Sequence, residues 1–170
     1  MLRPGCNNCP MPEGLNIRPA EPGDRDALGR LGAMLVQEHY DFDRLRFLAP
    51  MPDIQQRYGD FLVSRQGQPD HLVLVAERDA AIAGYVFGAK EDADFMMLRG
   101  PAGVVYDLLV HPDHRRQGVG AALMTAMLDA LAKLGAPRAL LYTAAKNEGA
   151  QAMFDRIGFR RTMVEMTREL

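Results

Sequence analysis

Residues Val104 to Met124 read VVYDLLVHPDHRRQGVGAALM: an apolar run, a short turn, then RRQGVG opening an apolar segment with helical spacing. The first N–H groups of a helix lack intrahelical partners, and the helix dipole adds partial positive charge at the same end. Gly118 and Gly120 have no Cβ, so an anion can approach those N–H groups closely. Arg115 and Arg116 add charge and bidentate donors. This stretch therefore predicts a strand–turn–helix unit with a phosphate site at the helix start.

Two common phosphate-binding signatures are not met by this turn. No Gly-x-x-x-x-Gly-Lys-Ser/Thr sequence is present, which argues against a P-loop nucleotide hydrolase. The pair Gly118 and Gly120 lacks the third glycine of the dinucleotide fingerprint. The phosphate ligand is therefore expected to be of another kind.

The turn resembles the coenzyme A pyrophosphate loop of the GCN5-related N-acetyltransferase (GNAT) family, whose pattern is Gln/Arg-x-x-Gly-x-Gly/Ala. The matching residues are Arg115 to Gly120. A second family motif, Asn-x-x-Ala-x-x-x-Tyr-x-x-x-Gly-Phe, follows at the expected distance. The chain matches it at Asn147, Ala150, Gly158 and Phe159, and departs from it at Phe154, where the family has tyrosine.

The resemblance implies an α/β fold: a single-domain mixed β-sheet flanked by helices, with splayed central parallel strands. The domain is expected over residues 14–170, after a flexible leader over residues 1–13 that carries Cys6 and Cys9. Residue patterns place strands at 15–19, 71–76, 82–87, 104–110, 140–143 and 162–168. They place helices at 24–38, 52–66, 120–134 and 147–157, and a long hairpin loop at 89–102.

Bulk composition limits the remaining function classes. The 170 residues include 48% apolar residues, and 20 basic and 22 acidic residues give a net charge of −2. With no basic block, no nucleic-acid partner is expected. No apolar run approaches the length of a membrane span, and no signal-peptide core is visible, so we expect no membrane association and a cytoplasmic location. His111 and His114 have no further ligands nearby, so no metal site is expected.

The resemblance also implies how acetyl-coenzyme A is held as co-substrate. Its pantetheine chain is expected to lie as a pseudo-strand along the backbone of Leu108, Leu109 and Val110, and the Val110 N–H is the expected oxyanion donor. The implied diphosphate loop consists of Arg115, Arg116, Gln117, Gly118, Val119, Gly120 and Ala121. Asn147 is expected to bind the pantetheine amide, or simply to cap its helix, and Phe154 stands at the family's tyrosine position.

The implied reaction is attack of a neutral amine on the thioester carbonyl, in a ternary complex. An amine with a pKa near ~10 needs a proton acceptor at neutral pH. Tyr106 and Asp107 are the candidates, and strand alternation predicts that only one of them faces the cleft directly. We favour Asp107, because a carboxylate in an apolar strand is costly unless it has a role or a partner.

Four questions are left open by the sequence. Glu38, Asp41 and Asp43 either attract a cationic acceptor or form an ordinary solvated helix end. The acceptor is a small-molecule or peptide amine. Because Phe154 cannot protonate a leaving thiolate, the alternative to an N-acetyltransferase is an acyl-coenzyme A binding module with little or no catalysis. The oligomeric state is also open between a monomer and a homodimer, because members of this family often pair subunits but no exposed apolar stripe in this sequence marks an interface.

Overall fold

The computed structural model describes residues 12–170, so Cys6, Cys9 and most of the expected leader lie outside the described residues. One mixed sheet has the strand order β1-β2-β3-β4-β5, antiparallel except for the parallel pair β4–β5. The elements are β1 (Asn16–Pro19), α1 (Arg25–Phe42), α2 (Ile54–Gln66), β2 (His71–Arg78), β3 (Ala81–Glu91), β4 (Ala102–Val110), α3 (Val119–Lys133), β5 (Ala139–Leu141) and α4 (Glu148–Arg156). The α/β class and the single mixed sheet are confirmed.

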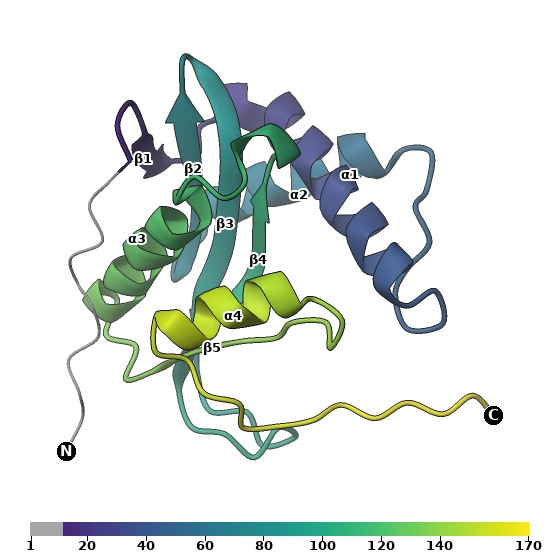
Figure 1. Ribbon diagram of the computed structural model, residues 1–170. Helices are drawn as coiled ribbons and strands as arrows, with labels where there is room; N and C mark the ends of the chain where they lie inside the picture. Colours follow the sequence, from purple (N-terminus) through teal and green to yellow (C-terminus); the bar gives the residue numbers. More distant parts are fainter. Residues whose placement is uncertain (1–11) are drawn as a thin grey trace.

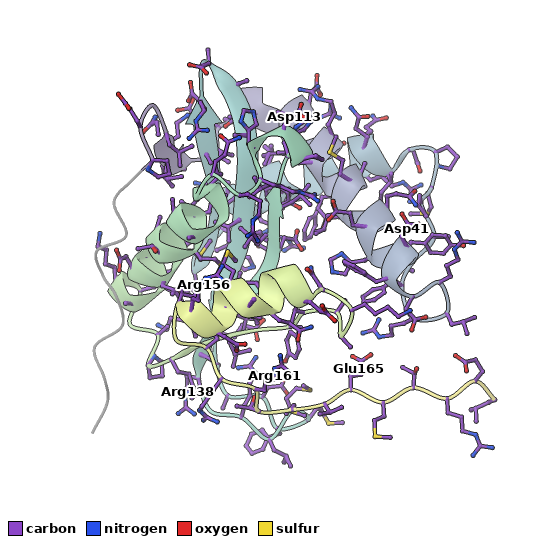
Figure 2. All side chains as sticks on the ribbon, in the orientation of Figure 1. Asp41, Asp113, Arg138, Arg156, Arg161 and Glu165 are labelled. Carbon is purple, nitrogen blue, oxygen red and sulfur yellow. The ribbon has the colours of Figure 1, made fainter. Side chains whose placement is uncertain are left out.

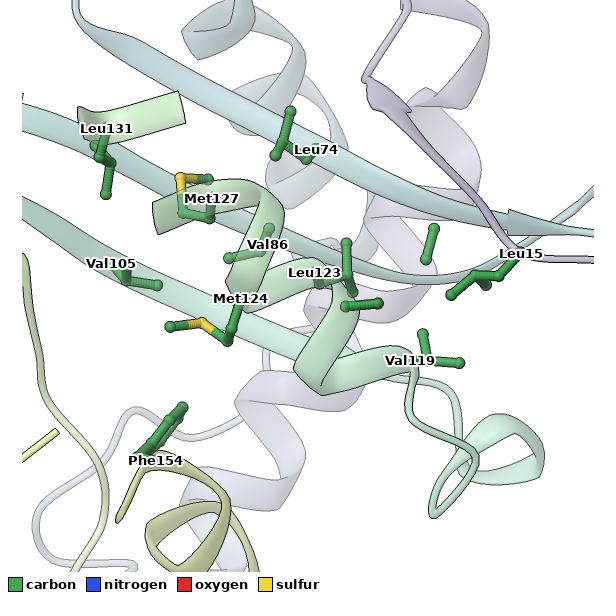
Figure 3. Close-up of a cluster of buried hydrophobic side chains, with 12 residues drawn as sticks. Leu15, Leu74, Val86, Val105, Val119, Leu123, Met124, Met127, Leu131 and Phe154 are labelled. Atoms are coloured by element: carbon green, nitrogen blue, oxygen red, sulfur yellow. The ribbon is translucent and has the colours of Figure 1, made fainter. Parts of the chain in front are cut away.

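Helices cover both faces of this sheet (Figure 1). On one face, α1 and α2 pack through Leu28, Leu31 and Leu62 against apolar side chains of β2, β3 and β4. On the other face, Leu123, Met127 and other side chains of α3 pack against the same strands, and Phe154 of α4 joins that cluster (Figure 3). The leucine and methionine stripes of α1 and α3 therefore belong to the core.

Strands β4 and β5 pair only along a short segment. Their register covers Gly103 to Val105 opposite Ala139 to Leu141, whereas β4 continues to Val110. Among the described residues, no strand pairs with this edge of β4 beyond Val105. The expected splaying of the central parallel strands is therefore confirmed.

A β-bulge marks the point where the two strands part. Opposite β3, Gly88 pairs with Val105 and Phe87 pairs with Asp107, so Tyr106 is an extra residue in β4. An extra residue bends a strand. It also reverses the strand edge toward which the backbone N–H and C=O groups of the following residues point. The bulge therefore changes which groups of β4 face the gap.

The predicted closing strand at residues 162–168 is wrong. This segment is not paired with any strand of the described sheet, and it runs as an extended yellow trace away from the domain (Figure 1). Met163, Val164 and Met166 are 69%, 84% and 90% exposed. Alternation predicts an extended backbone, but a strand also needs a partner, and β5 is only three residues long. The segment contacts the domain through an ion pair between Glu165 and Arg46; Figure 2 labels Glu165.

Several boundaries also differ from the predictions. Helix α1 continues four residues past the predicted end to Phe42, and β3 extends to Glu91, which shortens the expected hairpin loop to residues 92–101. β5 ends at Leu141 rather than Thr143. No helix among residues 12–170 has both the length and the apolar character needed to cross a bilayer.

Glycines allow α1 and α2 to approach closely. A Cβ at Gly29 would overlap the backbone of Gln55, and a Cβ at Gly32 would overlap the ring of Tyr58. Gly59 on α2 is similarly close to the backbone of Arg25. Small residues on both helices therefore fix the position of Tyr58 against the sheet.

We predict that Gly32→Ala lowers the free energy of unfolding by about 1–3 kcal/mol, because the added methyl group must displace the Tyr58 ring. Gly149→Ala is the matched control, since it adds the same methyl group to a helix where no atom lies within 4 Å. That change should stabilise by up to about 1 kcal/mol. Urea unfolding measures both, and equal effects of the two changes would contradict the tight α1–α2 contact.

Candidate functional site

The turn before α3 leaves backbone donors free at the start of a 15-residue helix. Gly118 is the N-cap, in a left-handed conformation with φ of 82°, and its carbonyl accepts the first helical hydrogen bond from Ala122 at 3.0 Å. The N–H groups of Val119, Gly120 and Ala121 therefore have no partner within the helix. Together with the helix dipole, they form a cradle suited to a diphosphate.

The polar side chains of this turn divide into two roles. Arg115 donates through Nε to the Val110 carbonyl oxygen at 3.0 Å and forms an ion pair with Glu38 on α1. Gln117 bonds the Asp113 carbonyl at 2.9 Å and also accepts from Arg78. Arg116 is exposed, with φ of 62°, and forms no ion pair with another described residue. Arg116 is thus the free cation of the turn, whereas Arg115 and Gln117 hold its shape.

Gly120 lies where α3 approaches α4. A Cβ placed there would meet the Met153 sulfur at 3.3 Å and a Val110 methyl group at 3.6 Å. A side chain would therefore fill the space between the cradle and the end of β4. Packing against Met153 and Val110 therefore favours glycine at position 120 even without a bound ligand.

The free edge of β4 runs from the bulge to this cradle. The N–H of His111 donates to Ala83 of β3 at 2.8 Å. Because strand amides alternate in direction, the N–H groups of Val110 and Leu108 point to the opposite edge, where no described strand pairs. Before the bulge, the odd-numbered residues point their amides to that edge, since the Gly103 N–H donates to the Arg138 carbonyl on the β5 side. The gap edge thus offers two backbone donors in line with the α3 N-terminus.

Asp107 lies on the α1–α2 face of the sheet and accepts hydrogen bonds from two tyrosines. The Tyr58 hydroxyl donates to its Oδ2 at 2.7 Å, and the fully buried Tyr85 hydroxyl donates to the same oxygen at 3.2 Å. Burial raises the pKa of Asp107 above its usual value, and the two hydroxyl donors partly oppose that rise. Asp107 is therefore a carboxylate that two hydroxyl donors hold in place and whose pKa is raised by burial.

Both tyrosines remain protonated donors at ordinary pH. Burial raises the pKa of Tyr58, and the nearby charge of Asp107 raises it further. Burial and Asp107 also raise the pKa of Tyr85 well above its usual value. Neither hydroxyl is therefore a source of negative charge next to Asp107, and each can only orient and stabilise it.

Tyr106 and Asp107 face the same cavity, which corrects the prediction that only one of them faces the cleft. The Tyr106 ring stacks on Phe87 with centroids 5.1 Å apart, and Phe87 pairs with Asp107 across the strands. Both Tyr106 and Asp107 line a cavity of about 400 Å³. The bulge explains this result, because simple alternation does not hold across an extra residue.

Phe154 packs on the opposite face of the sheet from Asp107, and Asn147 is the N-cap of the helix α4 that carries it. The Asn147 side chain accepts from the Ala150 N–H at 3.1 Å, which confirms its capping interpretation. Phe154 is buried in the core near Met124 and Val105 (Figure 3), and its ring meets Phe159 edge-on at 5.9 Å. The phenylalanine therefore fills core space at this position.

The acidic residues at the end of α1 are engaged locally. Glu38 pairs with Arg115, Asp41 accepts from Gln37 at 3.0 Å, and Asp43 accepts from backbone N–H groups of the following loop. None of the three lines the cavity beside Asp107. Their arrangement favours the structural interpretation over the recognition of a cationic acceptor.

Sequence reasoning missed the partners of Asp107. Tyr58 fitted the apolar face of the second predicted helix, and Tyr85 is the one hydroxyl in the apolar run from Ile82 to Phe87. A buried tyrosine needs a hydrogen-bond partner, and that need was the available signal. The partner itself could not be identified, because Tyr58 lies 49 residues from Asp107.

Comparisons with known proteins agree with this geometry. A sequence model of the acetyltransferase (GNAT) family matches residues 34–159. The mycothiol acetyltransferase of Clavibacter michiganensis is 29% identical over 164 residues, which cover 96% of this chain and 48% of that protein. The chain spans about half the length of the curated relatives it matches.

Solved structures show the same fold. A GCN5-related N-acetyltransferase from Ralstonia eutropha superposes with a TM-score of 0.69 at 24% identity, covering 92% of this chain and 99% of that one. A protein from Clostridium acetobutylicum described as a predicted acetyltransferase, solved with acetyl-coenzyme A, superposes with a TM-score of 0.68 at 15% identity, covering 90% of this chain and 96% of that one. The chain belongs to the acetyltransferase (GNAT) family.

We predict that Gly120→Asp abolishes binding of coenzyme A, because a side chain fills the space between the cradle and the end of β4 and its charge opposes the diphosphate. Gly120→Asn introduces a side chain of nearly the same size and shape as aspartate but without its charge. Its affinity for coenzyme A should therefore exceed that of Gly120→Asp by about tenfold or more. Isothermal titration calorimetry with coenzyme A measures both affinities.

The control pair is Gly67→Asp and Gly67→Asn, since Gly67 follows α2 and has no atom within 4 Å of an added Cβ. Both control variants should bind coenzyme A as the parent does. Parental affinity in Gly120→Asp would show that the diphosphate does not bind at this turn.

Proposed function

We propose that this protein transfers an acetyl group from acetyl-coenzyme A to a primary amine of a small molecule or peptide, by direct attack in a ternary complex. The observation that carries the proposal is the free edge of β4, which connects the N–H cradle of α3 to the bulge beside Asp107. Family membership supports the same reaction class.

The proposed binding mode uses groups that the fold leaves without partners. The diphosphate would lie at the N–H groups of Val119, Gly120 and Ala121, with Arg116 adding charge. The pantetheine would bond the N–H groups of Leu108 and Val110 as an additional strand. The thioester would then lie beside the gap edge of β4, where the Val110 N–H is the candidate donor to the developing oxyanion.

Asp107 is the candidate base. The amine nitrogen attacks the thioester carbonyl carbon, an N–C bond forms, and the C–S bond breaks with the electron pair leaving on sulfur. The proton lost by the amine passes to the Asp107 carboxylate, directly or through a water molecule. Tyr58 and Tyr85 hold the carboxylate in position for this transfer.

The leaving thiolate needs little help from the protein. A thiol has a pKa near ~8.5, so its anion is a tolerable leaving group near neutral pH and can take a proton from water. Phe154 is therefore compatible with catalysis, at the cost of some rate. General acid assistance is worth about 10²–10⁴ in rate, so its loss slows the reaction without preventing it.

Thiol release from acetyl-coenzyme A tests the proposal directly. The purified protein should release coenzyme A thiol only when an amine is present, and mass spectrometry should find that amine heavier by one acetyl group. The alternative, an acyl-coenzyme A binding module, predicts calorimetric binding of acetyl-coenzyme A with no thiol release for any amine in a broad panel.

We predict that Tyr58→Phe moves the acid limb of the kcat/KM profile to higher pH. The base must be ionised, and the Tyr58 hydrogen bond favours the ionised form, so removing that bond raises the pKa of Asp107 further. Asp107→Asn should remove this limb and lower kcat/KM by about 10²–10⁴. Rates measured from acidic to alkaline pH with one amine provide the profiles.

Tyr40→Phe is the control, because Tyr40 makes no hydrogen bond to Asp107. Its profile should coincide with that of the parent. An acid limb unchanged in both Tyr58→Phe and Asp107→Asn would exclude Asp107 as the base.

A further inference from the structure

The cavity beside Asp107 has features that the acetyl-transfer step alone does not require. It lies between α2, the start of β2, Phe87 of β3 and the bulge of β4, with a volume of about 400 Å³. Cavities of about 300–1,000 Å³ are typical of small-molecule sites. Asp107 and Tyr58 lie on its wall together with aromatic rings and with Arg65.

Aromatic rings surround Phe87 on three sides. The Tyr106 ring is 5.1 Å away and nearly parallel, the His71 ring is 6.1 Å away and nearly parallel, and the Phe61 ring meets it edge-on at 5.6 Å. Tyr106 and Phe61 are 43% and 37% exposed, so these rings present open faces and edges. Open aromatic surface of this kind favours a flat apolar or aromatic body.

The guanidinium of Arg65 places a positive charge on the cavity wall. The Arg65 guanidinium lies over the Phe61 ring at 4.9 Å, where Gln68 accepts one of its hydrogen bonds at 3.0 Å. Among residues 12–170, no carboxylate lies within ion-pair distance of it. An arginine that keeps free donors on a pocket wall is suited to a carboxylate or another planar anion.

Tyr58 and Arg65 are seven residues apart on α2, so they lie on one face of the helix, two turns apart. At a rise of 1.5 Å per residue, this separation is roughly 10 Å along the helix. Tyr58 bonds Asp107, so the carboxylate and the guanidinium are expected to recognise groups at opposite ends of one ligand. A compound with its amine and its anion on the same carbon atom is too short to reach both.

We propose that the acceptor is an arylalkylamine whose ring bears an anionic group at the end remote from the amine. This inference rests on the proposed acetyl transfer. The amine lies at Asp107, the ring lies against Phe87 and Tyr106, and the anion meets Arg65. A linear polyamine is a poor fit, because its second cation would lie beside the Arg65 guanidinium.

Initial rates with four amines test this substrate class: 4-(aminomethyl)benzoate, benzylamine, hexylamine and spermidine. 4-(Aminomethyl)benzoate should have the highest kcat/KM. In Arg65→Met, the ratio of its kcat/KM to that of benzylamine should fall by about tenfold to a hundredfold, as expected for loss of a charged hydrogen bond. Arg57→Met is the control on the same helix, since Arg57 pairs with Asp53 in solvent and does not line the cavity. It should leave the ratio unchanged.

The outcomes separate the two proposals. A preference for spermidine or hexylamine, or a ratio unaffected by Arg65→Met, would overturn the aromatic–anionic acceptor and leave acetyl transfer intact. If no amine releases thiol, the proposed function fails. Calorimetric titration of 4-(aminomethyl)benzoate into protein saturated with coenzyme A then tests separately whether the cavity binds this class of compound. Binding of 4-(aminomethyl)benzoate that Arg65→Met weakens would support the cavity assignment, and no binding would overturn it.

Discussion

The extra residue in β4 is the constraint on which the site depends. Opposite β3, the ladder skips Tyr106, and beyond this point β4 pairs with β3 alone. The bulge turns the amides of Leu108 and Val110 toward the gap. It also brings Tyr106 to the same cavity as Asp107. The short β5 leaves the strand edge open, and the inserted residue determines which amides of β4 face it and places Tyr106 beside Asp107.

The second requirement is an environment that tolerates a half-buried carboxylate. Burying Asp107 is unfavourable, and hydrogen bonds to a charged group offset such a penalty by about 1.5–3 kcal/mol each. One of the two donors, Tyr58, comes from α2, which is held close to α1 by Gly29, Gly32 and Gly59. The helix pair on this face is therefore part of the site, because its spacing determines where the Tyr58 hydroxyl lies.

Local features were predictable from the sequence, and features that depend on pairing were not. The strand, turn and helix from Val104 to Lys133 follow from apolar periodicity and two glycines, and the Asn147 cap follows from a short motif. The bulge was not predictable, because no residue type at Tyr106 requires it, and so strand alternation wrongly predicts that Tyr106 and Asp107 point to opposite faces. The expected strand at residues 162–168 failed for a related reason: alternation describes an extended chain and cannot supply a partner. The cavity combines α2, β2 and β4, whose proximity is a tertiary property.

Residue-resolved amide hydrogen exchange, followed by NMR with and without coenzyme A, tests the central claim most directly. In the free protein, the Val110 and Leu108 amides should exchange quickly, whereas His111, bonded to Ala83, should exchange slowly. Coenzyme A should slow exchange at Leu108 and Val110 together with Gly120 and leave His111 unchanged. Protection confined to α3, or Leu108 and Val110 amides that are already protected in the free protein, would contradict a pantetheine strand in the gap between β4 and β5.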